Sequence, residues 1–303
     1  MPELPEVETI RLGLQKYLVG VKPRGGHATL RGHKIVGVEV KLKKIVTGDT
    51  STSLSASIQH VIGSRIIGVR RFGKGLVIDL DNNYCIAIHI KLTGQLIYTD
   101  KNKKPPKEIK VIKDMHSSLP NKWTHVIFSL DRGAMLYYND FRQFGWIKIL
   151  KKDDLKTLEF FRDLGPEFFK DLTIEKFSKI LSKSKIAIKP LLMDQKKMSG
   201  LGNIYANDGL NLAKIDPRRS ASSLNKNEVQ TLFHALEKVL KNGLKYGGAS
   251  ELSYVNALGQ EGSYQNHFLV YGREGKPCKN CGTILKKIKL AGRGTYFCPK
   301  CQR

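Results

Sequence analysis

The sequence is short of acidic residues and has no long apolar run. Its 303 residues include 27 aspartates and glutamates against 52 lysines and arginines, so the formal net charge is +25. No stretch approaches the ~20 consecutive apolar residues of a membrane-spanning helix, and the N-terminus is acidic where an export signal would be basic. A large basic excess on a folded chain favours a polyanionic partner, and nucleic acid gains most because neutralising phosphates releases counterions. We therefore expect a soluble cytoplasmic protein that binds nucleic acid and not membrane.

Cysteine is also scarce, and four of the five cysteines stand in one motif. The motif is Cys278-x2-Cys281-x16-Cys298-x2-Cys301. Two close pairs at this separation suit tetrahedral coordination of zinc by thiolates, with each pair supplying one knuckle. A disulfide framework is the alternative, which a reducing compartment disfavours. We expect one structural Zn²⁺ ion, and we expect Cys85 to be a packed residue without chemistry.

The apolar pattern divides the chain into three regions. Up to residue 150, an apolar helical stripe is followed by short β-like runs, which predicts a helix and a mostly antiparallel β-sandwich or barrel. Helical periodicity follows from Asp153, and the last thirty residues hold the cysteines around a predicted hairpin. We predict an α+β protein with domains at 1–150, 151–272 and 273–303. The runs expected to form strands are 35–40, 66–70, 76–80, 84–90, 125–130 and 135–138. Residues 101–121 are expected to form a mobile basic insertion.

The N-terminus supplies the strongest chemical hypothesis. If Met1 is removed, Pro2 presents a secondary amine beside the carboxylate of Glu3. Such an amine can add to an aldehyde-like carbon and form an iminium, which an internal proline cannot do. The same residues also describe an ordinary amphipathic helix, with Pro5 near its start and Glu6 complementing its dipole. Both interpretations are compatible, because the helix would fix the amine in place.

Two glycine-flanked positions are weaker candidates for phosphate binding. Gly200 and Gly202 precede Asn203 at a predicted helix start, where backbone N–H groups can bind an anion; a helix cap is the alternative. Arg293 lies at the tip of the predicted hairpin, where it could enter a groove or remain a solvated surface arginine.

Taken together, the motifs resemble formamidopyrimidine-DNA glycosylases, and the likeness is colinear along the whole chain. The motifs that carry it are the start Pro2-Glu3-Leu4-Pro5-Glu6-Val7-Glu8-Thr9, Gly73-Lys74, Asp140-Phe141-Arg142-Gln143-Phe144-Gly145, Met193-Asp194-Gln195-Lys196, Gly200-Leu201-Gly202-Asn203-Ile204-Tyr205-Ala206, Tyr271-Gly272-Arg273, and Gly292-Arg293-Gly294-Thr295 with the cysteine quartet.

The resemblance implies a bifunctional repair enzyme that removes oxidised purines, such as 8-oxoguanine and formamidopyrimidines, and then nicks the strand by β,δ-elimination. It implies that Pro2 is the nucleophile at C1′ and that Glu3 donates and accepts protons at the sugar. Lys74 would assist β-elimination, and Arg293 would serve δ-elimination and phosphate binding. An iminium acidifies the C2′ hydrogen, so one site can perform both steps. The damaged base must first be extruded from the duplex.

The resemblance also implies a set of DNA contacts on a helix-two-turns-helix domain, a zinc finger and the N-terminal domain, with DNA in a basic cleft between the domains. The residues implied are Glu6, His89, Leu92, Trp123, Arg142, Phe144, Lys185 and Asn203.

Three of the implied positions depart from the family pattern. Leu92 stands where the family usually has the methionine that fills the gap left by the flipped base, and leucine can also wedge a base step. Gln143 replaces a second arginine beside Arg142 and Phe144, which match the residues that read the orphaned cytosine and intercalate. We expect weaker and less salt-sensitive binding as a result. Trp123 stands where a DNA-contacting histidine is common.

Two other functions fit parts of the sequence. An endonuclease VIII-like glycosylase for oxidised pyrimidines would share the chemistry; the N-terminal motif and the glycine-containing loop 247–265, which corresponds to the loop covering the damaged base, favour the purine enzyme. A non-catalytic zinc-ribbon nucleic-acid binder would explain the charge and the cysteines but would give Pro2, Glu3 and Lys74 no role. We expect a monomeric, bacterial, nucleoid-associated protein whose partner is double-stranded DNA containing a damaged base.

Overall fold

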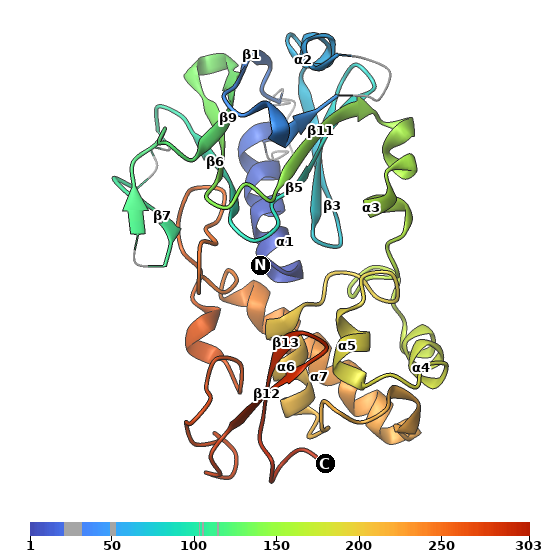
Figure 1. Ribbon diagram of the computed structural model, residues 1–303. Coiled ribbons are helices and arrows are strands. Elements are labelled where there is room, and N and C mark those ends of the chain that lie inside the picture. Colours follow the sequence, from blue (N-terminus) through green and yellow to red (C-terminus); the bar gives the residue numbers. More distant parts are fainter. Residues whose placement is uncertain (21–31, 49–52, 103, 105, 114) are drawn as a thin grey trace, which may run out of the picture. The chain divides into compact units, whose positions relative to one another are not determined.

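The computed structural model describes residues 1–20, 32–48, 53–102, 104, 106–113 and 115–303. These residues form two compact units (Figure 1). The first comprises Met1–Arg162 together with Gly247–Ser263, and the second comprises Asp163–Tyr246 together with Tyr264–Arg303. The segment Gly247–Ser263 therefore belongs to the N-terminal unit, although the sequence pattern groups it with the helical region.

The first unit begins with the helix α1, Leu4–Leu14. Pro5 stands in the first turn, where its missing N–H costs nothing, and Glu6 complements the positive end of the helix dipole. Val7, Ile10 and Leu14 are completely buried in a core shared with both sheets of the unit. Full burial of each such side chain is worth about 1.5–3 kcal/mol. The helix that carries the N-terminus is thus anchored along its apolar face.

Two sheets form the sandwich of this unit. One has the strand order β1-β9-β10-β6, and the other has the order β2-β11-β5-β4-β3. All pairings are antiparallel except that of β2 with β11, which is parallel. The strands are β1 (Ile35–Val40), β2 (Val46–Thr47), β3 (Ile66–Phe72), β4 (Gly75–Leu80), β5 (Tyr84–His89), β6 (Gly94–Thr99), β9 (Thr124–Leu130), β10 (Met135–Asp140) and β11 (Trp146–Lys151). The helices α2 (Leu54–Val61) and α3 (Glu159–Arg162) complete this part of the chain. The predicted helix and mostly antiparallel sandwich are confirmed.

The expected basic insertion contains a small hairpin. Strand β7, Ile109–Ile112, pairs with β8, Met115–Ser117. Residues 103, 105 and 114 of the insertion lie outside the described residues.

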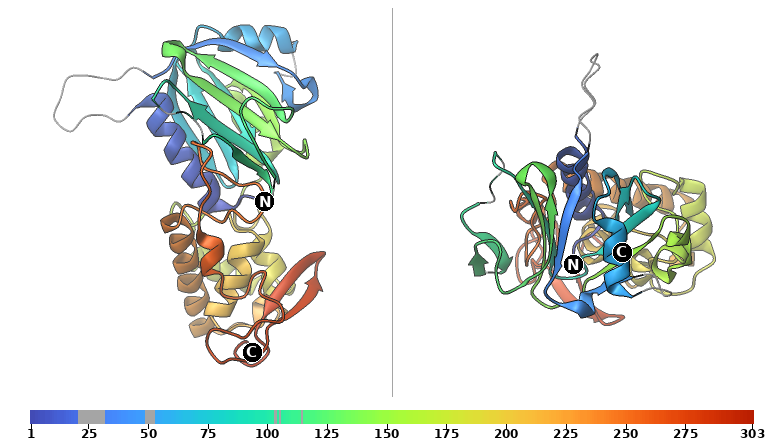
Figure 2. Two further views of the ribbon diagram at one scale, coloured as in Figure 1. Left: turned by 90° about the vertical axis from the view of Figure 1, so that its left-hand side faces the viewer. Right: turned by 90° about the horizontal axis from the view of Figure 1, so that it is seen from above.

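The second unit is helical and ends in a hairpin. Its elements are α4 (Ile174–Ser182), α5 (Ile188–Met193), α6 (Asn203–Leu212), α7 (Lys226–Lys245), β12 (Lys286–Leu290) and β13 (Arg293–Phe297). The longest helix, α7, starts with a capping box in which Asn225 and Glu228 exchange side-chain to backbone hydrogen bonds of 2.9 Å. Figure 2 shows the β12–β13 hairpin projecting from the helices of this unit. The predicted helical region and cysteine-bearing hairpin are confirmed.

None of the helices in the described part of the chain is both long and apolar enough to span a membrane.

Candidate active site

The residues that follow Met1 are buried. Pro2 is buried, and Glu3 is only 3 % exposed, whereas Met1 in front of them is 45 % exposed. Glu3 is the N-cap of α1, and its backbone N–H donates a hydrogen bond of 2.8 Å to Oε2 of Glu6. The first turn of α1 therefore fixes the backbone that follows Pro2.

The second oxygen of Glu6 binds the segment Gly247–Ser263, which we call the covering segment. Oε1 of Glu6 accepts a hydrogen bond of 2.8 Å from the backbone N–H of Ala249. The preceding Gly248 has φ +85°, and a Cβ atom there would lie 2.8 Å from Cγ of Glu6. Only glycine allows this close approach without strain. One carboxylate thus joins the start of α1 to the covering segment.

Hydrogen bonds within the covering segment fix its conformation. The Tyr254 hydroxyl donates to the carbonyl of Gly247, and the Ser250 hydroxyl donates to the carbonyl of Tyr254. Ser253 reaches the sandwich, because its hydroxyl donates to the carbonyl of Leu92 at 3.2 Å. The covering segment therefore contacts both the N-terminal helix and the loop that carries Leu92.

Lys74 lies near the N-terminal amine. It is 4 % exposed in the turn between β3 and β4. Burial lowers the pKa of the Met1 α-amino group, the carboxylates of Glu3 and Glu6 oppose this shift, and the charge of Lys74 adds to it. The net direction is downward. A lowered pKa increases the unprotonated fraction of a terminal amine at neutral pH.

A buried ion-pair network connects α1 to the turn of Lys74. Nε of Arg71 donates to Oε2 of Glu8 at 2.7 Å, and Nη1 of Arg71 donates to the carbonyl of Gly73 at 2.8 Å. Although burial alone would raise it, hydrogen bonds from Arg11 and Arg71 hold the pKa of Glu8 below its usual range. The predicted site did not include Glu8 or Arg71, because a glutamate in a first helical turn and an arginine in a strand are common on protein surfaces.

The imidazole of His89, at the end of β5, is neutral and offers one N–H group as a hydrogen-bond donor. It is 4 % exposed, and its Nδ1 accepts a hydrogen bond of 2.9 Å from the backbone N–H of Lys91. Burial, together with the charges of Lys91 and Lys74, lowers the pKa of His89 to about 3. Because Nδ1 is an acceptor, the ring proton resides on Nε2.

The loop between β10 and β11 displays Arg142 and Phe144. Phe144 is 56 % exposed, and the guanidinium carbon of Arg142 lies 4.8 Å from the centre of its ring. Asp140, which is fully buried, organises this loop by accepting hydrogen bonds from the backbone N–H groups of Arg142 and Gly145 and from the hydroxyl of Thr93. An exposed aromatic ring is thus held on a rigid support.

Thr93 connects the loop of Leu92 to the loop of Phe144, since its Oγ1 also accepts the N–H of Arg142 at 2.9 Å. Leu92 itself is half-buried. Trp123 is half-buried near the same region, with its ring 5.6 Å from that of Phe141, and its carbonyl accepts the N–H of Asp140. The predicted residues Leu92, Trp123, Arg142 and Phe144 therefore belong to one connected part of the first unit.

In the second unit, Asn203 is the first residue of α6 and is half-buried. The turn before it is fixed by Gln195, whose Oε1 accepts the N–H of Gly200 and whose Nε2 donates to the carbonyl of Leu201. Gly200 has φ +94°, which requires glycine. The start of this ten-residue helix is thereby presented in one fixed conformation. Lys185, which precedes α5, is exposed.

Arg293 is exposed at the start of β13, and two buried polar side chains hold that strand. Lys189, on α5, is 1 % exposed, and its Nζ donates to the carbonyl of Gly294 at 2.9 Å and to Oγ1 of Thr295 at 2.8 Å. Oδ1 of Asn207, on α6, accepts the N–H of Tyr296 at 2.8 Å. Neither Lys189 nor Asn207 was in the predicted site, because burial of a lysine cannot be deduced from one sequence.

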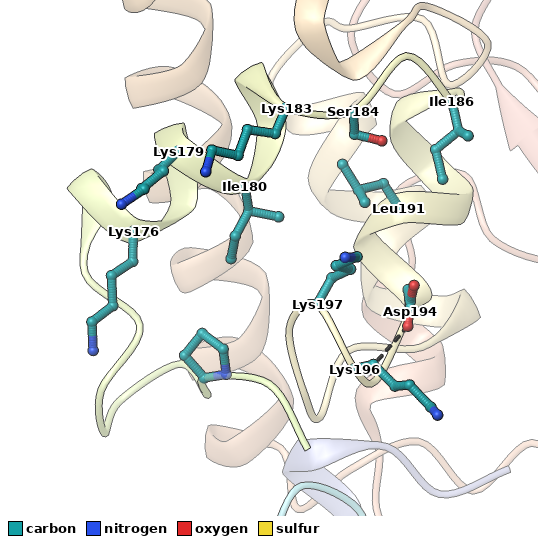
Figure 3. A pocket seen from close by; sticks show the side chains of 11 residues that line it. Lys176, Lys179, Ile180, Lys183, Ser184, Ile186, Leu191, Asp194, Lys196 and Lys197 are labelled. Carbon is teal, nitrogen blue, oxygen red and sulfur yellow. Dashed lines mark hydrogen bonds between the residues drawn. The ribbon is translucent and has the colours of Figure 1, made fainter. Parts of the chain in front are cut away.

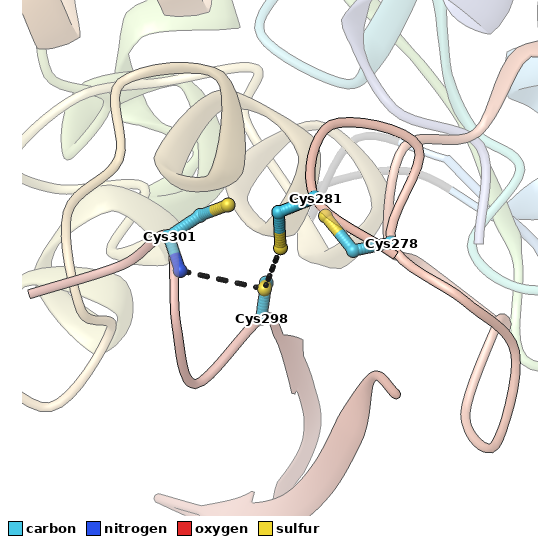
Figure 4. A group of neighbouring side chains, drawn as sticks. All are labelled: Cys278, Cys281, Cys298 and Cys301. Carbon is cyan, nitrogen blue, oxygen red and sulfur yellow. Dashed lines mark hydrogen bonds between the residues drawn. The ribbon is translucent and has the colours of Figure 1, made fainter. Parts of the chain in front are cut away.

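The four cysteines of the motif form a zinc-binding cluster (Figure 4). Their sulfur atoms all lie within 4.8 Å of one another, and those of Cys281 and Cys298 are 3.5 Å apart. Tetrahedral Zn–S bonds of about 2.3 Å place sulfur atoms about 3.8 Å apart, so these residues fit one Zn²⁺ ion. All five cysteines are free, which excludes the disulfide alternative, and Cys85 is buried and does not belong to this cluster. The predicted structural zinc ion is confirmed.

Comparison with known proteins gives matches along the chain. Residues 1–147 match the formamidopyrimidine-DNA glycosylase N-terminal domain, residues 164–254 match the formamidopyrimidine-DNA glycosylase H2TH domain, and residues 275–303 match a zinc finger found in FPG and IleRS. The combination of an N-terminal glycosylase domain, an H2TH domain and this zinc finger defines a class of DNA glycosylases.

Individual relatives agree with these matches. The chain is 38 % identical to the formamidopyrimidine-DNA glycosylase of Pelotomaculum thermopropionicum, over 100 % of this chain and 99 % of the relative. It is also 38 % identical to the enzyme of the same name from Streptococcus mutans, over the whole of both chains. The chain belongs to the formamidopyrimidine-DNA glycosylase family.

Solved structures of the family include complexes with DNA. A Lactococcus lactis Fpg bound to DNA with an abasic site is 31 % identical, with a TM-score of 0.82 and 99 % of each chain covered. The same Lactococcus enzyme bound to DNA containing FAPY-dG gives a TM-score of 0.81 at 30 % identity, over 99 % of this chain and 100 % of that one.

Replacing Lys189 with methionine should loosen the strand that carries Arg293. K189M keeps the apolar stem but removes both donors, which leaves two acceptors on β13 without that partner and costs about 1–3 kcal/mol. We expect faster hydrogen exchange of the β13 amides, measured by mass spectrometry. K286M, at an exposed lysine of β12, is the matched control. Equal exchange in K189M and K286M would contradict the positioning role of Lys189.

His89 should remain neutral at all pH values above about 4, because its pKa is lowered to about 3. Nitrogen-detected NMR of the imidazole should show the Nε2–H tautomer from pH 5 to pH 8. The unfolded chain binds a proton here near pH 6.5, so the free energy of unfolding should fall as the pH decreases from 6.5 toward 3, by at most ~1.4 kcal/mol per pH unit. H89Q should lack this contribution. Titration of His89 near pH 6.5 in the folded protein would contradict the prediction that this histidine stays neutral.

Proposed function

We propose that this protein is a bifunctional DNA glycosylase and AP lyase that acts through Pro2. It excises oxidised purines, including 8-oxoguanine and formamidopyrimidines, from duplex DNA in base excision repair, and it works in the bacterial cytoplasm at the nucleoid. Membership of the family supports the reaction class. The observation that carries the assignment of Pro2 is the buried N-terminal segment, in which Pro2 and Glu3 are buried and the charges of Glu3, Glu6 and Lys74 act on the terminal amine of Met1.

The first chemical step is displacement of the base. Removal of Met1 gives Pro2 a secondary amine, whose lone pair attacks C1′ of the damaged nucleotide while the bond from C1′ to the base nitrogen breaks. The base leaves with the bonding pair and takes up the N–H proton that the attacking nitrogen loses, so the nitrogen regains its lone pair. Glu3, adjacent to the amine, protonates the ring oxygen of the sugar; the bond from C1′ to that oxygen breaks, and the nitrogen lone pair forms the double bond of an iminium between Pro2 and C1′. A lowered amine pKa, in the direction found for the Met1 amine, favours the nucleophilic form.

The second step is strand cleavage. The iminium acidifies the C2′ hydrogen, and its loss as a proton expels the 3′ phosphate; a further elimination expels the 5′ phosphate. The cation of Lys74 stabilises the negative charge that develops on the first leaving phosphate, and the exposed guanidinium of Arg293 binds the second. Hydrolysis of the iminium then releases Pro2.

The remaining predicted residues are assigned to the DNA. Leu92 and Phe144 occupy the space of the extruded base and separate the neighbouring step, and Arg142 reads the opposite base. The Nε2–H of His89 and the start of α6 at Asn203 donate to phosphates. Lys185 adds an ionic phosphate contact, and Trp123 contributes an aromatic face beside the loop of Phe144. Glu6 acts as a positioning residue through the covering segment, which closes over the damaged base.

Borohydride trapping tests the role of Pro2. With a duplex carrying 8-oxoguanine opposite cytosine, the wild-type protein should yield a covalent complex whose peptide map places deoxyribose on Pro2. A protein with an N-terminal tag that blocks Pro2 should yield none, and removal of the tag to expose Pro2 should restore it. E3Q should slow base release by about 10²–10⁴-fold.

Two outcomes would overturn the assignment. Trapping by the blocked protein would show that another amine attacks the sugar. Trapping on a duplex with oxidised thymine, but never on one with 8-oxoguanine, would assign the protein to the glycosylases that act on oxidised pyrimidines.

A further inference from the structure

A cavity in the second unit has no role in the reaction described above. It has a volume of about 640 Å³, within the range of typical ligand pockets. It lies between α4, the end of α5 and the turn that follows α5 (Figure 3). Its lining combines apolar side chains with five lysines and a single aspartate. The lining residues are Pro166, Lys176, Lys179, Ile180, Lys183, Ser184, Ile186, Leu191, Asp194, Lys196 and Lys197.

The lysines of α4 form one edge of this cavity. Lys176, Lys179 and Lys183 are spaced by three and four residues, so they lie on one helix face, and Ile180 accompanies them. The opposite face of α4 carries Phe177, which is buried. The lysine face of α4 therefore points outward, because the helix packs through the face that carries Phe177.

The positive charge of the cavity is only partly balanced within the protein. Nζ of Lys196 pairs with Asp163 at 2.8 Å, and Nζ of Lys176 donates to the carbonyl of Asp171 at 2.7 Å. Among the described residues, no ion pair joins Lys179, Lys183 or Lys197 to a carboxylate. The one acidic side chain, Asp194, already accepts the backbone N–H of Lys196 at 2.9 Å.

The apolar part of the cavity indicates what kind of anion fits. Ile186 is 51 % exposed, and Ile180 is half-buried, while Leu191 closes the floor at 1 % exposure. Figure 3 shows Ile180 and Leu191 between the lysines of α4 and the turn with Asp194 and Lys197. A DNA backbone presents phosphates and sugars but no projecting aliphatic or aromatic side chain, so it leaves such a floor unfilled. An acidic peptide with an apolar anchor matches both the lysine edge and the floor.

We propose that this cavity docks an acidic peptide segment of a partner protein, with one large apolar side chain over Ile180 and Leu191 and carboxylates paired with Lys179 and Lys183. Lys179 and Lys183 lie four residues apart, which is about 6 Å along α4, and about two residues of extended peptide cover this distance. Two carboxylates that flank one apolar residue therefore reach both lysines.

Fluorescence anisotropy with the full-length, zinc-loaded protein tests this proposal. The probe is a labelled ten-residue peptide of glutamates and leucines with one central phenylalanine. A second peptide has the same charge but serine in place of every apolar residue. We expect the first peptide to bind at least about 10-fold more tightly than the second. We expect K179Q/K183Q to weaken its binding about 10-fold, since each exposed pair contributes up to ~1 kcal/mol.

Matched controls separate docking from general charge and from DNA binding. K226Q/K238Q removes two exposed lysines of α7 that do not line the cavity and should leave peptide binding unchanged. K179Q/K183Q should retain nicking of an 8-oxoguanine duplex at saturating DNA, so the proposal is tested independently of the catalytic assignment.

Four results would overturn the proposal. They are equal binding of the two peptides, equal weakening by both double variants, displacement of the peptide by an undamaged duplex at one equivalent, and loss of nicking in K179Q/K183Q. The last two would assign the cavity to the DNA-binding surface.

Discussion

A single buried carboxylate joins the start of α1 to the covering segment. Glu6 accepts the N–H of Glu3 with one oxygen and the N–H of Ala249 with the other, at 2.8 Å in both cases. The first contact fixes the start of α1 behind the proposed nucleophile, and the second holds the covering segment, which is separated from it by more than two hundred residues in sequence. Because Glu6 is 1 % exposed, both hydrogen bonds form away from water, where an unmade bond to a charged group is costly. The reactive end of the chain and the segment beside it are therefore organised together.

A similar arrangement recurs at two side chains that we propose contact DNA. Phe144 and Arg293 are exposed, whereas the side chains that position them are buried and polar. Asp140 fixes the loop of Phe144, and Lys189 fixes the strand of Arg293. A recognition side chain must leave its own hydrogen-bonding and apolar surface available for the ligand, so its geometry has to be set by neighbours. Structural zinc extends this arrangement to the end of the chain, where the small hairpin has little core of its own.

The sequence predicted the elements whose signals are local. Short runs rich in apolar residues located β1, β4 and β5 to within about two residues, because such runs and the turn residues that bound them are read directly from the residue order. The cysteine spacing identified the zinc cluster for the same reason. β6 and β11 were not predicted, because β6 holds only three consecutive apolar residues between Gln95 and Thr99, and β11 mixes tryptophan, isoleucine and lysine. The helical region expected from residue 153 begins with a 3-10 turn and the four-residue α3, and its longer helices start only at α4.

Other features of the site depend on contacts that are distant in sequence. The positioning residues Glu8, Arg71, Asp140 and Lys189 carry no motif of their own, and the covering segment lies in the C-terminal half of the chain but packs with the first unit. The resemblance supplied the names of the reacting residues, while the structure supplied the reasons that their geometry holds.

Hydrogen exchange of the covering segment in E6Q measures the contribution of the Glu6 carboxylate directly. A glutamine can accept only through its single carbonyl oxygen, so one of the two backbone donors loses its partner. We predict that amide exchange accelerates by at least about 10-fold in peptides covering 247–263 or at the first turn of α1, while peptides from β9 and β10 are unchanged. Unchanged exchange in both places, or acceleration spread evenly over the whole first unit, would contradict the claim that the Glu6 carboxylate organises both the start of α1 and the covering segment.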